Sequence, residues 1–303
     1  MRVITKIKDL HIDKKSILTI GNFDGVHRGH QKIINKVVKE AKTQKVQSVV
    51  LTFANHPAVF LNKIPPLFLM QNKEKEEFFK RLGVDIVIFL KFTDSLAKKS
   101  PSDFLKFLFN RIFILKIVVG ENFCFGKGNQ GNVNFLREQT SVLDYKFNSV
   151  SLLKEKTFFI SSSVIRKLIL KGNVAQANKL LGYEYSIEAI VVKGKQLGQT
   201  LGFPTLNFNI KSLKKIIPSS GVYKTKTQIG KKIYNSFTFI NTMKVKPVFE
   251  TFVLKFDRNA YGKTVRVYFE EFLRKPKKIK NLEELKHQIQ LDVYQGGSQH
   301  GFY

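Results

Sequence analysis

A glycine-rich turn with two histidines joins an apolar run to a helical pattern near the start of the chain. The run Ile17–Ile20 is followed at residues 21–30 by Gly-Asn-Phe-Asp-Gly-Val-His-Arg-Gly-His, and apolar residues at helical spacing come next. A helix that begins at such a turn directs its first, unpaired N–H groups toward the turn. Two imidazoles add donors for a phosphoryl oxygen. The segment therefore predicts a phosphate site and, with it, nucleotide chemistry.

Short apolar runs alternate with helical patterns from Ser16 to about Gly182, which is typical of a parallel βαβ sheet. We expect strands at Ile17–Ile20, Ser48–Phe53, Asp85–Leu90, Ile117–Val119 and Ser149–Leu153. We expect helices near 30–42, 73–82 and 102–111, the last opened by Ser100 and Pro101. The first half is predicted to be a Rossmann-like α/β domain whose active site lies at the carboxyl ends of the strands.

The pattern changes after Tyr183 to stretches of alternating apolar and polar residues separated by glycine turns. These stretches include Ile187–Lys193, Gly221–Thr227, Phe249–Phe256 and Val265–Phe269. One amphipathic helix follows, with Asn281 as its cap. We predict an α/β domain over residues 1–183 and a small antiparallel β-barrel with a terminal helix over residues 184–303.

Composition limits the possible functions. No apolar run approaches the roughly 20 residues that span a bilayer, so we expect a cytoplasmic protein without membrane contact. The single cysteine, Cys124, cannot form an internal disulfide or a thiolate metal cage. The net charge of +29 is spread along the chain and attracts polyanions such as ATP. We expect nucleic acid to bind only weakly, in a salt-sensitive way, and without specificity.

Three more segments of the first half suit a nucleotide and a flat ring. Residues 52–57 follow a T-F-x-x-H-P pattern, and residues 120–126 follow a G-E-N-F-x-F-G pattern, each at a strand end. Residues 160–166 form a serine-rich turn into a helix, whose hydroxyl, N–H and guanidinium groups suit a triphosphate. Taken singly, the phenylalanines could pack in the core and the serines could be an ordinary helix cap.

Together these motifs resemble the HxGH nucleotidyltransferases and, more closely, the FMN adenylyltransferase module of bacterial bifunctional riboflavin kinase/FAD synthetases. The resemblance implies an ATP site formed by Gly21, Phe23, Asp24, His27, His30, Ser162, Ser163 and Arg166. It implies a flavin site bordered by Phe53, His56, Pro57, Asn122 and Phe123. The histidines would stabilise the α-phosphate while the FMN phosphate attacks it. Cys124 stands where the family often has arginine, and Ser163 where it has threonine.

A second glycine-rich segment, residues 194–207, leads into a Pro-Thr-x-Asn tetrad at the start of a strand. Its spacing matches neither a Walker loop nor a kinase G-x-G-x-x-G motif. Backbone N–H groups of such a loop can still bind phosphates, and the oxygens of Thr205 and Asn207 suit Mg²⁺. A glycine-rich barrel turn with polar strand residues would have a similar sequence.

This run is similar to the signature of riboflavin kinases, which continues with Gly-Val-Tyr at residues 221–223. The resemblance implies ATP contacts from Gly194, Lys195, Gly198, Gly202, Thr205, Asn207, Gly221 and Tyr223. It also implies Mg²⁺ at Thr205 and Asn207, a flavin contact from Arg274, and Glu250 as the base that deprotonates riboflavin. Glu250 could instead be a solvent-facing strand residue. Residues 241–247, Leu206 and Pro276 depart from the family's pattern on the flavin side.

We therefore expect an enzyme that makes FMN from riboflavin and ATP in the barrel, and FAD from FMN and ATP in the first domain. Mg²⁺ is the expected metal, and no obligatory protein partner is evident. Two alternatives remain open at this point. The altered segment 241–247 would fit a nucleotidyltransferase whose barrel only binds flavin, and the +29 charge would fit a nucleic-acid-binding protein.

Overall fold

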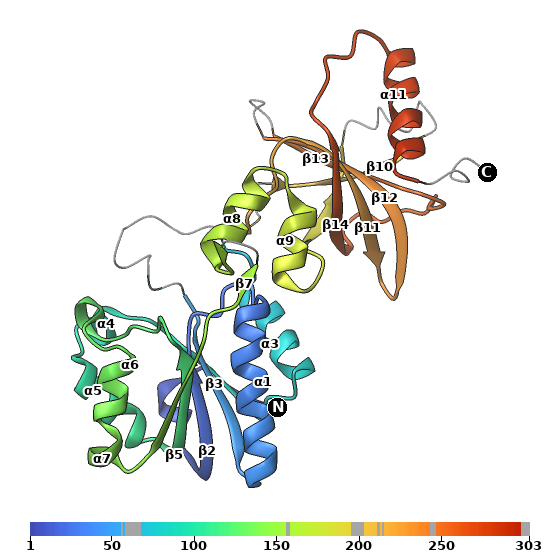
Figure 1. Cartoon of the computed structure of the whole chain (residues 1–303). Helices are drawn as coiled ribbons and strands as arrows, with labels where there is room; N and C mark the ends of the chain where they lie inside the picture. The colour runs from blue at the N-terminus through green and yellow to red at the C-terminus, as the bar shows by residue number, and fades with distance from the viewer. Residues whose placement is uncertain are drawn as a thin grey trace. The chain divides into compact units, whose positions relative to one another are not determined.

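The computed structural model describes residues 1–55, 57, 68–155, 158–194, 203–210, 213, 215–242 and 247–297. The chain forms two units, Met1–Ser162 and Ser163–Tyr303 (Figure 1). Four residues with predicted site roles, His56, Lys195, Gly198 and Gly202, lie outside the described residues. The same is true of residues 243–246 in the segment that departs from the riboflavin kinase pattern.

A six-stranded parallel sheet forms the centre of the first unit, in the order β1-β4-β3-β2-β5-β6. Its strands are β1 (Arg2–Ile4), β2 (Ile12–Ile20), β3 (Gln47–Phe53), β4 (Ile86–Leu90), β5 (Ile112–Gly120) and β6 (Lys146–Val150). The predicted Rossmann-like α/β fold is confirmed. The chain runs outward from β2 through β3 to β4 and later returns to place β5 on the other side of β2. This reversal makes the carboxyl ends of β2 and β5 the expected ligand site.

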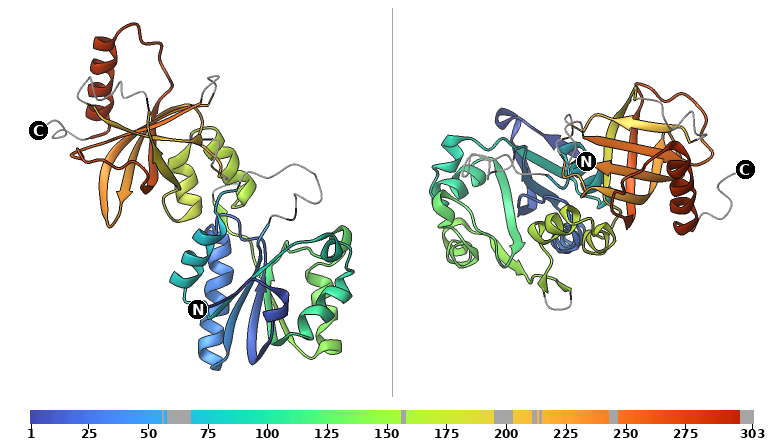
Figure 2. Two further views of the ribbon diagram at one scale, coloured as in Figure 1. Left: turned by 180° about the vertical axis from the view of Figure 1, so that it is seen from behind. Right: turned by 90° about the horizontal axis from the view of Figure 1, so that it is seen from above.

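Helices cover both faces of this sheet (Figures 1 and 2). They are α1 (Arg28–Gln44), α3 (Asn72–Arg81), α4 (Asp94–Ala97), α5 (Pro101–Phe109), α6 (Val133–Glu138) and α7 (Thr140–Leu143), with short 3₁₀ turns at Ile7–Asp9 and Lys127–Asn129. On one face, Ile17 of β2 packs in a cluster with Val37 of α1. On the other, Leu18 belongs to the larger core that contains Leu105 of α5. Burial on both faces explains why these strands are nearly continuous apolar runs.

The second unit is a closed antiparallel barrel preceded by two helices. The helices are α8 (Ser162–Leu170), whose first residue still belongs to the first unit, and α9 (Val174–Leu181); the short pair β7 (Lys154–Glu155) and β8 (Phe158–Phe159) lies before them. The barrel order is β10-β13-β12-β11-β14-β9. Its strands are β9 (Ser186–Val192), β10 (Thr205–Phe208), β11 (Gly221–Ile229), β12 (Lys232–Asn241), β13 (Val248–Val253) and β14 (Thr264–Arg274). The predicted barrel and terminal helix, α11 (Leu282–Gln295), are confirmed.

The interior of the barrel combines aromatic rings with hydroxyl groups. The rings of Tyr223 and Phe249 both contact Phe269, which comes from a third strand, so these side chains meet inside the barrel. The hydroxyls of Thr225, Thr227, Ser236, Thr238 and Thr251 are at most 1% exposed and bond to one another at 2.8–2.9 Å. On the outside, α11 packs Val293 against Phe237 and Leu254 (Figure 2).

Candidate active sites

The two histidines of the first unit stack at the N-terminus of α1. Their ring centroids are 3.6 Å apart and their planes differ by 19°. His27 is the N-cap of the helix: its Nδ1 accepts a hydrogen bond of 3.4 Å from the backbone N–H of His30. Because Nδ1 accepts, neutral His27 carries its proton on Nε2, where it is a donor. The pair therefore adds imidazole groups to the positive end of a 17-residue helix.

Burial keeps His30 neutral. Burial of the ring, then the charge of His27, then the charge of Lys75 set the pKa of His30 well below its usual value. Its Nδ1 is buried and has no hydrogen-bond partner among the described residues. A buried polar atom of this kind requires an explanation, and a bound ligand or water is one.

Hydrogen bonds from three neighbouring segments hold the loop between β2 and α1. The carbonyl of Asn22 accepts from Thr52 of β3 at 3.0 Å and from Lys75 of α3 at 2.8 Å. Asp24, which is 1% exposed, accepts from the backbone N–H groups of Leu69 and Met70 at 3.1–3.2 Å. The hydroxyl of Ser162 donates to the carbonyl of Asp24 at 2.9 Å. The loop is thus held by contacts within the chain.

The backbone of this loop is strained. Phe23 and Val26 adopt positive φ angles of 46° and 31°, in the left-handed region that side chains disfavour. Phe23 is 3% exposed, and its ring lies so close to Gly21 that a Cβ there would be 2.8 Å from the ring. The structure therefore uses Gly21, Phe23 and Asp24, all predicted to bind ATP, to shape the loop that presents the histidines.

An aromatic cavity of about 170 Å³ opens at the carboxyl ends of the same strands. It brings together Phe53, Pro57 and Phe123, which the sequence predicted at the flavin, and it adds Cys124. Its remaining lining residues are Ile20, Phe92, Leu96, Ala97, Phe104, Phe125, Gly126, Gly128 and Asn129. Asn122 is not among them; it packs over Gly120, where a Cβ would be 3.3 Å from its Oδ1.

The cavity wall also contains an aromatic residue that the sequence motifs did not identify. Phe92 meets Phe53 edge to face, with ring centroids 5.3 Å apart. Phe92 lies just past the end of β4. Its position directly after a predicted strand is the sequence feature that could have identified it. Ser163 and Arg166 lie in α8, in the second unit, so the structure does not place them relative to the histidines.

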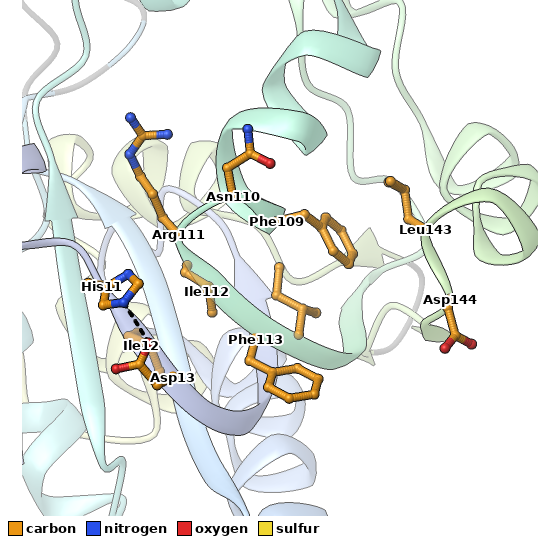
Figure 3. Close-up of a pocket in the computed structure, with 11 residues that line it drawn as sticks. His11, Ile12, Asp13, Phe109, Asn110, Arg111, Ile112, Phe113, Leu143 and Asp144 are labelled. Atoms are coloured by element: carbon orange, nitrogen blue, oxygen red, sulfur yellow. Dashed lines mark ion pairs between the residues drawn. The ribbon is translucent and has the colours of Figure 1, made fainter.

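A larger hollow, of about 410 Å³, lies at the opposite end of the strands (Figure 3). His11–Asp13 and residues 109–114 line it, with Leu143 and Asp144 on the far side. Its ion pair, between His11 and Asp13 at 2.6 Å, is largely exposed. Ligands of open parallel sheets bind at the carboxyl ends, so the smaller aromatic cavity is the better candidate site.

In the barrel, the pairing of β10 with β13 places the predicted metal ligands next to the predicted base. Asn207 of β10 is directly opposite Glu250 of β13. Directly opposed residues share a face, and Thr205, two positions along, shares it too. Thr251 is buried in the interior, so this trio lies on the outer face. The Nδ2 atom of Asn207 is 3.4 Å from both the carbonyl and the hydroxyl of Thr205.

Gly194 packs against the amide of Asn207. A Cβ there would lie 2.3 Å from Cγ of Asn207, so only glycine fits without moving the amide. Among the described residues, no three His, Cys, Asp or Glu side chains gather into a metal site. A metal bound at Thr205 and Asn207 would therefore take its other ligands from water and substrate phosphates, as Mg²⁺ commonly does.

Three other residues with predicted roles in the barrel make structural contacts. Tyr223 is fully buried, its hydroxyl donates to the carbonyl of Ser219 at 2.6 Å, and burial raises its pKa to about 12. Gly221 leaves room for the ring of Phe272, which a Cβ would approach to 2.3 Å. Arg274 forms a two-armed ion pair with Asp292 of α11, at 2.6 and 2.7 Å. Their roles at the ligands remain predictions.

Comparisons with known proteins cover both units. A family model described as FAD synthetase matches residues 9–164, and one described as riboflavin kinase matches residues 181–298. The bifunctional riboflavin kinase/FMN adenylyltransferase of Buchnera aphidicola subsp. Schizaphis graminum is 33% identical over 97% of both chains. The chain belongs to the bifunctional riboflavin kinase/FMN adenylyltransferase family. Its first unit carries the FAD synthetase domain, and its barrel is the riboflavin kinase domain.

Other relatives agree with this assignment. The enzyme of the same description from Bacillus subtilis is 31% identical over 92% of this chain and 90% of its own. The Escherichia coli one is 31% identical over 91% and 90%. A solved structure described as a macrolide-efflux protein from Streptococcus pneumoniae has a TM-score of 0.91 and 28% identity, covering 97% of this chain and 98% of that one. Within the described residues, no helix has the length and apolar character needed to cross a membrane.

The prediction of two activities is therefore confirmed: the family phosphorylates riboflavin to FMN and adenylylates FMN to FAD, using ATP in both steps. The riboflavin kinase match includes the altered segment 241–247 that motivated the monofunctional alternative. The flavin biosynthetic relatives match along almost the whole chain, and the +29 charge needs no nucleic-acid partner to explain it.

Proposed function

We propose that FMN is adenylylated at the stacked pair of His27 and His30, with the flavin ring in the cavity lined by Phe53 and Phe123. The observation that carries this proposal is the position of the pair. The two imidazoles stack at the N-terminus of α1, at the point where the strand order reverses, and the aromatic cavity opens at the carboxyl ends of the same strands.

The chemistry of this step needs alignment and positive charge. A phosphate oxygen of FMN attacks the α-phosphorus of ATP, the bond from that phosphorus to the bridging oxygen breaks, and pyrophosphate leaves. The imidazoles at this helix N-terminus donate N–H groups to the oxygens on which negative charge accumulates. In this proposal Ser162, the first residue of α8, offers its backbone N–H to the triphosphate, and the roles of Ser163 and Arg166 remain predictions from the sequence.

We further propose that riboflavin is phosphorylated on the outer face of β10 and β13. Glu250 accepts the proton of the riboflavin 5′-hydroxyl, whose oxygen then attacks the γ-phosphorus of ATP and displaces ADP. The pairing of Asn207 with Glu250 supports this assignment, because it brings a phosphate-side residue and a carboxylate to neighbouring positions on one face.

Mg²⁺ is the metal of this proposal, and the donor set fits it. Thr205 and Asn207 offer oxygen atoms, which are the ligands that Mg²⁺ prefers. When bound with ATP, the ion supplies positive charge to the phosphate oxygens. A cytoplasmic location, where ATP is available, is part of the same proposal.

Chromatography of flavin products from the purified full-length enzyme tests both sites. With riboflavin, ATP and Mg²⁺, His27→Ala and His30→Ala are expected to stop at FMN. Glu250→Gln is expected to leave riboflavin unchanged but to convert supplied FMN to FAD. His11→Ala and Glu271→Gln, which change exposed residues that have no predicted site role, are the matched controls. FAD formation by either histidine variant at the wild-type rate would contradict the first assignment, and FMN formation by Glu250→Gln would contradict the second.

A further inference from the structure

The structure buries a lysine beneath the loop that carries the histidine pair. Lys75, on α3, is 2% exposed, and its Nζ donates to the carbonyl of Asn22 at 2.8 Å. Its sequence surroundings, Asn-Lys-Glu-Lys-Glu-Glu, resemble those of a solvent-exposed helix and give no sign of burial. The burial of this charge is therefore information that only the structure provides.

α3 contacts the β2–α1 loop at two positions one helical turn apart. Lys75 reaches Asn22, and Phe79, which is fully buried, meets Phe23 edge to face at 6.1 Å. Phe23 in turn meets the ring of His30 edge to face at 5.2 Å. Residues four apart share a helix face, so one face of α3 supplies both an apolar contact and an ammonium group to this loop.

The hydrogen bond alone does not explain a charged residue here. The carbonyl of Asn22 also accepts from the hydroxyl of Thr52 at 3.0 Å, so it has a neutral donor already. A glutamine could supply a second neutral donor. Burying an ammonium group is costly, and that cost is offset only where the charge meets a compensating group. The ammonium of Lys75 acts beyond this hydrogen bond, and one such interaction is its electrostatic effect on His30.

The surrounding ionisable groups show where the charge acts. The loop and α1 contribute Asp24, His27 and His30, while the exposed Arg28 of α1 is paired with Glu155 at 3.3 Å. Asp24 accepts from the backbone of residues 69 and 70. Burial, then His27, and then the positive charge of Lys75 lower the pKa of His30. Lys75 thus contributes to making protonated His30 unfavourable. It also adds positive potential at the N-terminus of α1.

We propose that Lys75 is a positioning residue for FMN adenylylation: its ammonium fixes the β2–α1 loop and supplies permanent positive charge behind the two imidazoles that face the α-phosphate of ATP. This inference rests on the proposed role of His27 and His30. Lys75 contacts the loop and not the substrate. Its field stabilises the negative charge that builds on the phosphoryl oxygens as the FMN phosphate attacks, and that charge is larger in the transition state than in bound ATP.

The test compares Lys75→Gln, which keeps a donor and removes the charge, with Lys75→Arg, which keeps the charge. Both are made in the full chain and assayed for FAD formation from FMN and ATP, with riboflavin phosphorylation by the same preparation as the internal reference. We expect Lys75→Gln to lower kcat for FAD formation about tenfold or more while the KM for FMN changes little. Lys75→Arg is expected to retain most of the activity.

A spectroscopic readout separates charge from packing. Among the six histidines, the Cε1–H resonance of His30 is identified by its loss in His30→Gln. In Lys75→Gln this resonance is expected to titrate at higher pH than in the wild type and in Lys75→Arg. The matched control is Phe79→Leu, which weakens the other contact of α3 with the loop and leaves the charge in place. Phe79→Leu is expected to lower the melting temperature without moving the His30 titration.

Two results would overturn the proposal. One is wild-type kcat in a folded Lys75→Gln enzyme. The other is an activity loss in proportion to lost thermal stability, as in Phe79→Leu, with an unmoved His30 titration. Should the glutamine variant not fold, Lys75→Met, which keeps the unbranched stem without a polar end, takes its place under the same criteria. Undiminished FAD formation by His30→Ala would instead refute the proposed histidine site, which is a separate outcome.

Discussion

The two candidate sites are built in different ways. The histidine site lies on a loop beyond a strand end, where backbone strain, a buried carboxylate and a buried lysine fix two side chains. The barrel site lies across two paired strands, where the register alone brings Asn207 opposite Glu250. Strain at functional loops must be compensated by surrounding contacts, whereas a strand pair needs only its ladder. The first site should therefore depend on distant supports more than the second.

The largest expected effect concerns the independence of the two sites. His30→Ala and Glu250→Gln, each unable to convert riboflavin to FAD, are expected to restore the overall reaction when mixed. The first variant makes FMN in its barrel, and the second adenylylates that FMN in its α/β domain. The measurement is chromatographic FAD yield from riboflavin, with each variant alone as the control. A mixture that stays as inactive as its components would show that FMN is not released between the steps.

The ion pair between Arg274 and Asp292 is expected to contribute more to the stability of the barrel than a more exposed pair does. Asp292 is 4% exposed and also accepts from Gln288 at 3.1 Å. Asp292→Ala is expected to remove the carboxylate partner of the Arg274 guanidinium, whose side chain is 18% exposed, and to lower the barrel's free energy of unfolding by about 3–5 kcal/mol. The more exposed pair of Arg266 and Glu188 is the control, and Glu188→Ala is expected to cost at most about 1 kcal/mol. Because the chain has no tryptophan, scanning calorimetry is the suitable measurement. Equal losses in both variants would contradict this expectation.

Gly194→Ala tests whether the barrel site depends on close packing. A Cβ at this position would lie 2.3 Å from Cγ of Asn207 and so must displace the amide. Displacement by about 1 Å can reduce catalysis by up to about 100-fold, and we expect riboflavin phosphorylation to fall by about tenfold or more. FAD formation from supplied FMN is expected to be unchanged. Gly230→Ala, where a Cβ meets nothing within 4 Å but the φ of +62° disfavours alanine, controls for destabilisation of the barrel by the loss of a glycine. Unchanged phosphorylation in Gly194→Ala would argue that Asn207 is not placed by this contact.

The smallest expected effect is a pH dependence of stability. The pKa of His30 is lowered in the folded chain, chiefly by burial, so below the ordinary histidine pKa the unfolded chain binds a proton that the folded chain does not. The contribution of His30 to the free energy of unfolding is complete above its ordinary pKa. It is lost as the pH falls from that ordinary pKa toward the lowered pKa of the folded chain. The slope is at most about 1.4 kcal/mol per pH unit. His30→Gln is expected to flatten the fall in melting temperature of the α/β domain between neutral and mildly acidic pH. An unchanged fall would mean that His30 titrates normally.

The fold was largely predictable because the strands are apolar on both faces or alternate regularly. The expected strands at 17–20 and 48–53 lie within β2 and β3. The amino-terminal part of β2 was missed because Asp13, Lys14 and Lys15 are exposed and charged, and β1 because it is a three-residue edge strand. β6 lies three residues earlier than expected, since Phe147 is the one apolar residue among its first four.

The candidate sites were predictable only where a motif sits in a short segment. His27, His30, Phe53 and Phe123 belong to such segments, and the structure gathers the first two at one helix end and the last two in one cavity. Lys75 and Phe92 were not predicted, because their roles depend on contacts with residues that lie far away in the sequence. The pairing of Arg274 with Asp292 was hidden for the same reason: the two residues lie on different elements, 18 positions apart.

The row of hydroxyls inside the barrel couples the hydrogen-bond donors of three strands. Thr227, Ser236, Thr225, Thr238 and Thr251 form a continuous chain of four bonds across β11, β12 and β13. Each hydroxyl has a single proton to give, so when Thr227 at one end accepts, every following hydroxyl of the chain must donate toward it. Valine in place of Thr225 would interrupt the chain in the middle and leave two isolated fragments. The directions of these hydrogen bonds are thereby linked across three strands. The chain of bonds ends at Thr251, which precedes no other hydroxyl of the row and follows Glu250 in the sequence.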